Sequence, residues 1–208
     1  MALRRGFRQG AKVHQSSPWD LLVIGLGNPG DKYRGTVHNV GVEVLELLAA
    51  RGGERFRTSK HHALVAEARF GPARVALAFP QTFMNDSGRA VAPLVSHYGI
   101  EDLSKLVVVH DELDLEPGRM KVKFGGGLAG HNGLKSIKAH LHTGDFTRIR
   151  IGVGKPPGGS QRGVSHVLGP PSKAARALLD VCVVEAADAV EMLITEPVES
   201  VMGRYNQR

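Results

Sequence analysis

A histidine, an aspartate and three asparagines stand where predicted strands end or predicted helices begin. They are His38, Asp111, Asn28, Asn85 and Asn132. In open α/β sheets, ligands bind beyond the carboxyl ends of the strands, so these side chains could converge on one cleft. A carboxylate that accepts a hydrogen bond from one histidine nitrogen leaves the other nitrogen to act as a base near neutral pH. His38 with Asp111 is therefore a candidate general-base pair.

The group that such a base would activate is water, because the sequence shows no activated side-chain nucleophile. It contains no GxSxG turn, no CxxC pair, no HExxH and no P-loop pattern. Asparagine amides could bind a carbonyl, position the water or stabilise a developing oxyanion. Each asparagine taken alone is better explained as a turn or cap residue. The segment HDELD, residues 110–114, could alternatively bind a divalent cation.

The glycines at positions 25, 27 and 30 follow an apolar run with the GxGxxG spacing of a dinucleotide-binding turn. In that motif, a helix begins at the second glycine and meets the pyrophosphate. Here the apolar helical pattern begins only near His38. The segment after that helix, residues 54–63, is basic and not strand-like, whereas the motif needs a strand that ends in an acid. The pattern therefore indicates a turn or a close approach of the backbone rather than a dinucleotide site.

Hydrophobic periodicity predicts the order of the elements. Strands are expected at residues 20–27, 63–70, 74–79, 105–113, 118–124 and 147–154, and helices at 38–53, 85–99, 131–142 and 172–194. The second and third strands read as a hairpin around a Gly-Pro turn. Strands that alternate with helices predict one α/β domain over residues 19–208, a twisted mixed β-sheet flanked by helices. The single cysteine, Cys182, is expected to pack as a small hydrophobe and fits a reducing compartment.

Positive charge is concentrated in part of the chain, whose net charge is +7. Residues 119–155 hold eight basic side chains and one acid, whereas residues 101–118 hold six acids and one lysine. A basic zone beside an acidic one suggests that an anionic partner, such as a nucleic acid, docks on one face. Residues 1–18 are basic and free of acids. We expect a flexible extension there, with an organelle presequence as the alternative. No apolar run approaches the ~18 residues needed to cross a membrane.

Four segments resemble bacterial-type peptidyl-tRNA hydrolases in order and spacing. They are GLGNPGDKYRGTVHNVG, FMNDSG, HDELDLEPGRMKVKFGGGLAGHNGLKSI and FTRIRIGVGKP, and the resemblance runs from about Trp19 to the C-terminus. It implies the α/β fold of that family (phosphorylase/hydrolase-like) and a monomeric, cytoplasmic ester hydrolase that needs no metal or cofactor. Its partner would be peptidyl-tRNA, cut between the peptide carboxyl and the 3′ ribose, which would recycle tRNA for translation.

The resemblance also implies roles for individual residues. His38 would be the base that activates water, Asp111 would support it, and Asn28 would help to tell an N-blocked peptide from a free aminoacyl group. Substrate contacts are implied for Tyr33, Phe83, Met84, Asn85, His131 and Asn132, and contacts to tRNA phosphates for Lys121, Lys123 and Arg150.

One position departs from the pattern of that family. The family usually has an arginine directly before the histidine, whereas this chain has Val37. The base stays in place, but whatever local anchoring the arginine supplies is missing.

The resemblance leaves one alternative function. Some proteins similar to this family bind RNA in splicing without catalysis. The histidine, the aspartate and the three asparagines introduced above are all present in this chain, which favours the enzyme.

Overall fold

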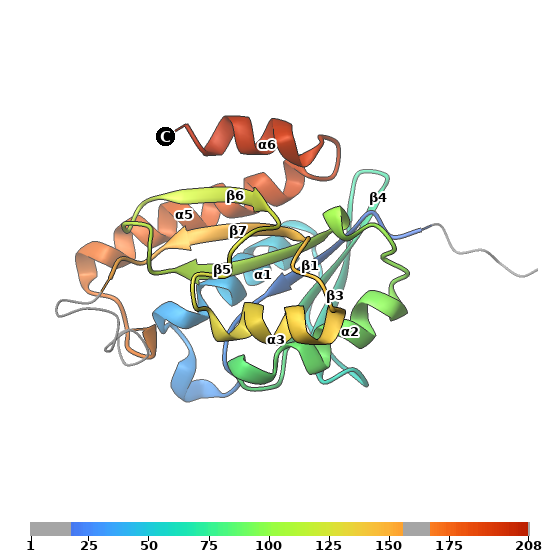
Figure 1. Ribbon diagram of the computed structural model, residues 1–208, viewed down its shortest axis with the longest axis horizontal. Coiled ribbons are helices and arrows are strands. Elements are labelled where there is room, and N and C mark those ends of the chain that lie inside the picture. The colour runs from blue at the N-terminus through green and yellow to red at the C-terminus, as the bar shows by residue number, and fades with distance from the viewer. Residues whose placement is uncertain (1–17, 156–166, 208) are drawn as a thin grey trace, which may run out of the picture.

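A seven-stranded mixed sheet forms the centre of the computed structural model, which describes residues 18–155 and 167–207 (Figure 1). The strands are β1 (Leu21–Gly25), β2 (Arg57–Ser59), β3 (Ala63–Phe70), β4 (Ala73–Pro80), β5 (Leu106–Glu112), β6 (Met120–Phe124) and β7 (Thr147–Gly152), in the order β2-β3-β4-β1-β5-β7-β6. β4, β1, β5 and β7 run parallel, and β2, β3 and β6 are antiparallel to their neighbours. The predicted single α/β domain with a mixed sheet is confirmed. Apart from Pro18, the predicted basic extension lies outside the described residues.

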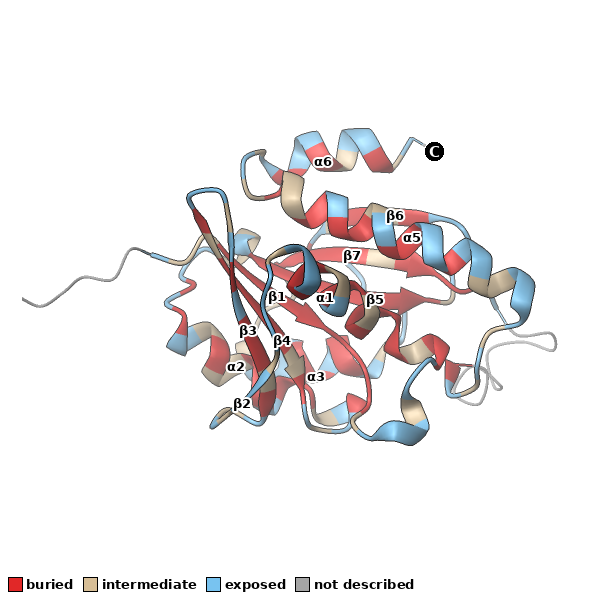
Figure 2. Cartoon of the chain, turned by 180° about the vertical axis from the view of Figure 1, so that it is seen from behind, coloured by how far each residue is buried: buried red, intermediate tan, exposed pale blue. Residues whose placement is uncertain are grey.

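Helices cover both faces of the sheet (Figure 1). One face carries α1 (Val40–Arg51), α5 (Lys173–Met192) and α6 (Val198–Tyr205), and the other carries α2 (Gly88–His97) and α3 (Asn132–Leu141). Short 3-10 turns are η1 (Asp31–Tyr33), η2 (Val37–Asn39), η3 (Met84–Asp86) and η4 (Leu103–Lys105). Figure 2 shows the central strands buried along their length. This burial explains why β1 and β5 read as continuous apolar runs rather than alternating ones.

The sequence prediction was wrong at the edge of the sheet. Residues 57–59, expected not to be strand-like, form β2, and Arg57 lies opposite Val65 of β3. All three residues of β2 are polar and none is buried. A short exposed edge strand has no buried face and therefore no hydrophobic alternation to detect.

The last helix, α6, had no counterpart in the prediction. It begins after Pro197 and buries Val198, Val201 and Tyr205. Positions i, i+3 and i+7 form one helical face, and a proline at a helix start is common, so both signals were present in the sequence.

The first glycine of the GxGxxG pattern serves packing. A Cβ on Gly25 would overlap the carbonyl oxygen of Gly41 in α1, and a Cβ on Gly41 would overlap the carbonyl oxygen of Val109 in β5. The two glycines therefore let α1 lie directly on β1 and β5. Because α1 begins only at Val40, its N-terminus does not lie at the glycine turn as a dinucleotide site requires.

Helix α5 is an amphipathic cover for one face of the sheet. Ser172 caps it by accepting a hydrogen bond from the N–H of Ala175 at 3.2 Å, and Arg176 pairs with Glu43 of α1 at 2.9 Å. Cys182 is buried in its apolar face, where burial raises the pKa of the thiol to about 11. The thiol is therefore protonated at neutral pH and packs as predicted.

Among the described residues, no helix is long and apolar enough to cross a lipid bilayer.

Candidate active site

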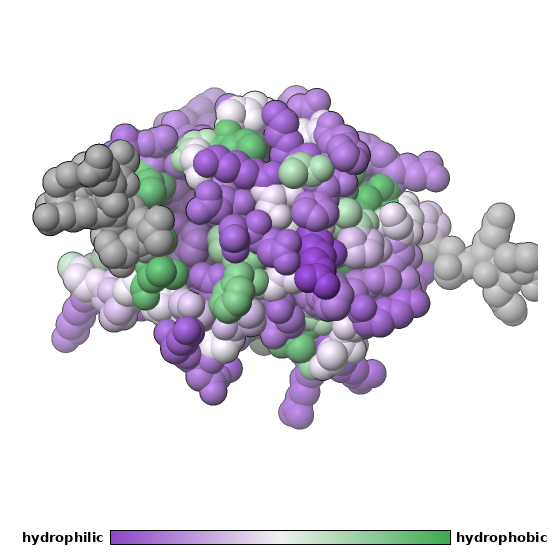
Figure 3. All heavy atoms as spheres, turned by 60° about the horizontal axis from the view of Figure 1, so that its bottom comes forward, coloured by the Kyte–Doolittle hydropathy of each residue, from purple (hydrophilic) through white to green (hydrophobic). Residues whose placement is uncertain are grey.

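A cleft of about 500 Å³ lies beyond the carboxyl ends of β1 and β5. Eight of the predicted site residues line it: Asn28, His38, Phe83, Met84, Asn85, Asp111, His131 and Asn132. They come from segments far apart in the chain and meet because parallel strands present their carboxyl ends at one edge. In Figure 3, the face that carries α2 and α3 is mostly hydrophilic, and its apolar side chains appear as separate spots.

His38 and Asp111 form the closest pair in the cleft. Nδ1 of His38, on η2, lies 2.7 Å from Oδ1 of Asp111, near the end of β5. Burial opposes the charge of Asp111, but His131 and His38 outweigh it and hold the pKa of the carboxyl well below its usual range. The carboxylate is therefore ionised at neutral pH and accepts the Nδ1–H of His38. This leaves Nε2 of His38 as the nitrogen that can take a proton from water.

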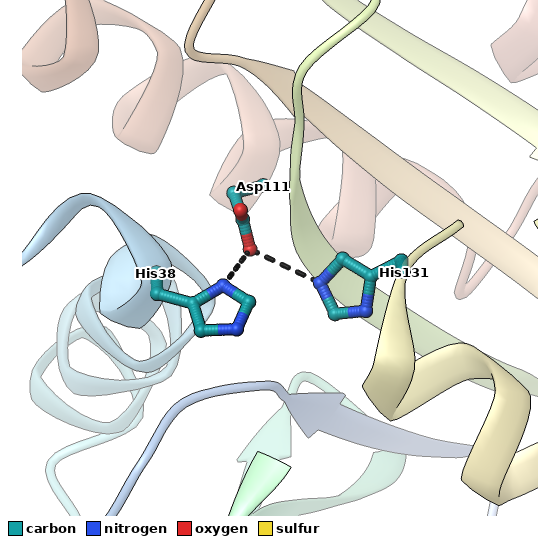
Figure 4. A group of neighbouring side chains, drawn as sticks. All are labelled: His38, Asp111 and His131. Carbon is teal, nitrogen blue, oxygen red and sulfur yellow. Dashed lines mark hydrogen bonds and ion pairs between the residues drawn. The ribbon is translucent and has the colours of Figure 1, made fainter. Parts of the chain in front are cut away.

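The same carboxylate oxygen has a second histidine neighbour, shown in Figure 4. Nε2 of His131 lies 3.1 Å from Oδ1 of Asp111. His131 is the N-cap of α3, and its Nδ1 accepts a hydrogen bond from the N–H of Leu134 at 3.4 Å. His131 was expected to contact substrate, but its two ring nitrogens face Asp111 and the start of α3.

These three side chains are also the one potential metal-binding group found in residues 18–155 and 167–207. A zinc ion sits ~2.0–2.2 Å from each of its nitrogen and oxygen ligands, which surround it tetrahedrally. The ligand atoms are therefore spread around the ion and do not hydrogen-bond to one another. Here Oδ1 of Asp111 lies 2.7 Å from one histidine nitrogen and 3.1 Å from the other, within direct hydrogen-bonding distance. The arrangement fits two N–H donors on one carboxylate better than three ligands around an ion.

The acidic segment 110–114 gives no support to a divalent-cation site. Glu112 accepts a hydrogen bond from Nε of Arg150 at 3.0 Å, and Asp114 pairs with Lys155 at 2.7 Å. Asp111 faces the two histidines described above. The carboxylates of the segment are thus engaged by side chains of the protein itself.

Asn28 is oriented by the backbone of η3. Its Oδ1 accepts a hydrogen bond from the N–H of Met84 at 2.8 Å. The NH₂ group of the same amide has no protein acceptor among residues 18–155 and 167–207, and Asn28 lines the cleft. Asn28 can therefore donate to a carbonyl oxygen of a bound ligand.

Asn39 is a structural residue of the site that the sequence analysis missed. Its Oδ1 accepts from the N–H of Asn28 at 2.9 Å, and its Nδ2 donates to the carbonyl oxygen of Asn28 at 3.0 Å. Both residues are buried. The position of Asn39 directly after His38 was its one signal in the sequence.

His110 was considered only as part of the acidic segment, and its role was also missed. It is fully buried, and its Nδ1 donates to the carbonyl oxygen of Asp111 at 2.7 Å. Its ring lies edge-to-face against that of His131, with 4.9 Å between centroids. Burial lowers the pKa of His110 to about 3, so the ring behind His131 is neutral.

Val37 shows how the segment that carries the base is anchored without an arginine. Its N–H donates to the carbonyl oxygen of Gly169 at 3.1 Å. Its side chain is buried in the core on the α1 and α5 side of the sheet. A backbone hydrogen bond and apolar packing therefore hold η2 in place.

Four predicted contacts lie outside the cleft. Tyr33 ends η1, and the ammonium group of Lys32 lies 4.8 Å from its ring centroid. Lys121 and Lys123 of β6 lie opposite Arg150 and Arg148 of β7, so the four side chains share one face at the edge of the sheet. Arg150 is already paired with Glu112. The two lysines are therefore the cations of this edge that can more readily bind an anionic partner.

Comparisons with known proteins identify the family of this chain. The model of the peptidyl-tRNA hydrolase family matches residues 22–208. A peptidyl-tRNA hydrolase of Mycobacterium sp. (strain KMS) is 48% identical over 180 residues, which cover 86% of this chain and 93% of the relative. One from Leifsonia xyli subsp. xyli (strain CTCB07) is 47% identical over 187 residues, 89% of this chain and 96% of the relative.

The fold also matches a solved structure. The crystal structure of peptidyl-tRNA hydrolase from Acinetobacter baumannii superimposes with a TM-score of 0.85 at 36% identity, covering 92% of this chain and 97% of that chain. With the family model and the curated relatives, this likeness shows that the chain belongs to the peptidyl-tRNA hydrolase family, of the bacterial type.

Proposed function

We propose that this chain hydrolyses the ester between the C-terminal carboxyl of a peptide, or of an N-blocked amino acid, and the 3′ ribose of tRNA. Family membership supports the substrate, and the His38–Asp111 pair in the cleft carries the mechanism. Nε2 of His38 takes a proton from water while the water oxygen attacks the ester carbonyl. The bond to the ribose oxygen then breaks, and that oxygen takes up the proton.

The reaction is proposed to need neither a metal ion nor an organic cofactor. The support is the hydrogen-bonding geometry around Asp111, where both neighbouring histidine nitrogens lie at donor distance from one oxygen. In a metal site these nitrogens would have to give up their protons and turn to a shared ion.

The amides of the cleft are proposed to recognise peptide backbone. Asn28 presents its NH₂ group, and Asn85 and Asn132 are exposed at the lining. Phe83 is 60% exposed and offers an apolar surface, beside the buried Met84, against which substrate can pack. Groups that bind main-chain carbonyls do not select among side chains, which suits an enzyme that meets every nascent sequence.

The remaining predicted residues are proposed to contact tRNA. Lys121 and Lys123, with Arg150 beside them, would bind phosphates and so position tRNA without reading its sequence, and Tyr33 would contact substrate outside the cleft. We further propose a monomer that works in the cytoplasm, where peptidyl-tRNA arises. The organelle alternative depends on residues 1–18, of which only Pro18 lies within the described residues.

The test is release of N-acetyl-aminoacyl groups from tRNA by the purified protein in the presence of a metal chelator. His38→Ala should lower the rate by about 10²–10⁴-fold while tRNA binding persists. Equal rates for the two proteins would contradict the assignment of the base. A protein that binds tRNA but releases nothing would instead be a non-catalytic RNA-binding relative, which the intact cleft does not favour.

A further inference from the structure

Two histidines flank one carboxylate oxygen in this cleft, and distance alone does not assign their roles. Oδ1 of Asp111 lies 2.7 Å from Nδ1 of His38 and 3.1 Å from Nε2 of His131. The exposed fractions of the two rings are 13% and 7%. The difference between the two histidines comes from what faces the second nitrogen of each ring.

The second nitrogen of His131 is committed to the start of α3. Nδ1 accepts the N–H of Leu134, so it carries a lone pair and no proton. The proton of a neutral His131 is then on Nε2, which faces Asp111. A second proton on Nδ1 would point at an N–H group and at the positive end of the α3 dipole, and it would remove the cap. The fold therefore favours neutral His131 with a fixed tautomer.

The second nitrogen of His38 is not committed in this way. Nε2 of His38 has no hydrogen-bond partner among residues 18–155 and 167–207, and His38 lines the cleft. His38 can therefore gain and lose a proton on Nε2 while Nδ1 stays bonded to Asp111. The same carboxylate oxygen thus faces one histidine whose second nitrogen is bonded to the backbone of α3 and one whose second nitrogen faces the cleft.

We propose that His131 is a positioning residue, held neutral with its proton on Nε2 by the N-terminus of α3, and that it shares the Asp111 carboxylate with His38. The Nε2–H of His131 occupies part of the hydrogen-bonding capacity of Oδ1 and partly offsets the negative charge of the carboxylate. Asp111 therefore favours the protonated form of His38 less than an unshared carboxylate would. His38 therefore stays available as a base at a lower pH. The inference rests on the proposed function, because it assigns a further role within the same site.

The other charged and titratable groups around the pair do not supply this effect. His110 of β5 packs behind His131 and is neutral, because burial lowers its pKa to about 3. Glu112 of β5 also lines the cleft but is neutralised by Arg150 of β7 at 3.0 Å. Within the described part of the chain, the lining of the cleft contains no titratable side chain other than His38, Asp111, Glu112 and His131.

The tautomer can be measured without any activity. In two-bond ¹H–¹⁵N spectra of ¹⁵N-labelled protein, signals lost in His131→Asn identify His131. We expect them to show a neutral ring protonated on Nε2, unchanged while His38 titrates. A ring protonated on Nδ1, or one that becomes doubly protonated together with His38, would overturn the proposal. This result stands even if the protein proves to lack hydrolase activity, in which case the proposed function alone fails.

The kinetic test separates the shared carboxylate from the helix cap. His131→Asn keeps an N-cap for α3 but is too short to reach Asp111 as well, whereas His131→Ala loses both contacts. In both variants we expect the acid limb of the pH profile of kcat/KM to move up by about half a pH unit or more. The Asp111 carboxylate would then interact with His38 alone and favour its protonated form more strongly. Asp102→Ala is the matched control, since it removes the cap of η4, which precedes β5 at the end opposite to Asp111. An unmoved acid limb in folded His131→Asn would contradict the proposal, as would an equal shift in the Asp102 variant.

Discussion

The side chain of Asn39 bonds to both backbone polar groups of Asn28. Nδ2 donates to the carbonyl oxygen at 3.0 Å, and Oδ1 accepts from the N–H at 2.9 Å. The turn after β1 is thereby fixed to the segment that carries His38, because Asn39 is its immediate neighbour. One asparagine thus sets the distance between the proposed base and the amide proposed to bind the peptide.

Replacing Asn39 by alanine should damage both stability and turnover. Two buried backbone groups would lose their partners, which lowers the free energy of unfolding by about 2–4 kcal/mol. Urea denaturation measures this loss, and kcat at a temperature where the variant is folded measures the effect on the site. We expect kcat to fall at least tenfold, since Asn28 and His38 would no longer be held together.

Asn206 provides a matched control for that variant. Its side chain makes the same pair of bonds to the backbone of Val122, at 2.9 Å to the N–H and 2.8 Å to the carbonyl oxygen, away from the cleft. Asn206→Ala should lose comparable stability and keep kcat within about twofold of the original chain. If both variants lose kcat equally, the effect of Asn39 is general destabilisation.

The two lysines of β6 should govern the salt dependence of tRNA binding. Lys121→Glu and Lys123→Glu should each weaken tRNA binding and reduce the slope of log affinity against log salt by about one. Titrations of tRNA at several salt concentrations give the slope. Lys173→Glu, at the exposed start of α5, should leave it unchanged. An unaltered slope in the β6 variants would mean that this edge is only a solvated surface.

Arg150 should matter more for folding than the lysines beside it. The Glu112 carboxylate that it pairs with is 4% exposed, so Arg150→Ala leaves a buried charge without its partner. We expect the free energy of unfolding to fall by about 3 kcal/mol. The double variant Arg150→Met with Glu112→Leu should recover most of that loss, which urea denaturation would show. A single variant as stable as the original chain would contradict the buried-pair interpretation.

The free energy of unfolding should decline as the pH falls, and the decline should begin well above the pH range in which carboxylates titrate. The pKa of His110 falls from 6.5 to about 3 on folding, so the unfolded chain binds a proton there first. The stability that this histidine contributes is complete above pH 6.5 and is lost as the pH falls toward 3. The lowered pKa of Asp111 acts in the same direction, below its ordinary value of 3.8.

A single variant isolates the histidine contribution. In His110→Asn, which keeps a donor for the carbonyl oxygen of Asp111, the slope of unfolding free energy between pH 4 and 6 should drop by up to about 1.4 kcal/mol per pH unit. Denaturation curves at several pH values measure it. The same slope in both proteins would show that His110 is not the group responsible.

The framework of the fold could be predicted because its signals are local. The apolar runs of β1 and β5, and the Gly-Pro turn of the β3–β4 hairpin, specify their structure within a few residues. β2 could not be predicted, because Arg57 and its neighbours become a strand only by pairing with β3. The secondary structure of such an edge is decided by tertiary contacts rather than by its own composition.

The site divides in a similar way. Asn28, His38 and Asp111 could be expected to meet, since strand ends and helix starts gather at one edge of a parallel sheet. The partners that fix them could not, because Asn39 and His131 act through single hydrogen bonds set by the packed geometry. In the sequence, an asparagine just before one helix and a histidine just before another have no feature that indicates such roles.

The hydrogen bond from Val37 to Gly169 has a consequence for the synthesis of the protein itself. The segment that bears the base is anchored to a residue near the start of α5, late in the chain. While translation is under way, the growing polypeptide is itself a peptidyl-tRNA. Its own cleft cannot be completed until Gly169 has left the ribosome and folded. The order of the elements along the chain therefore makes completion of the cleft a late event in synthesis, after the base and its carboxylate have already been made.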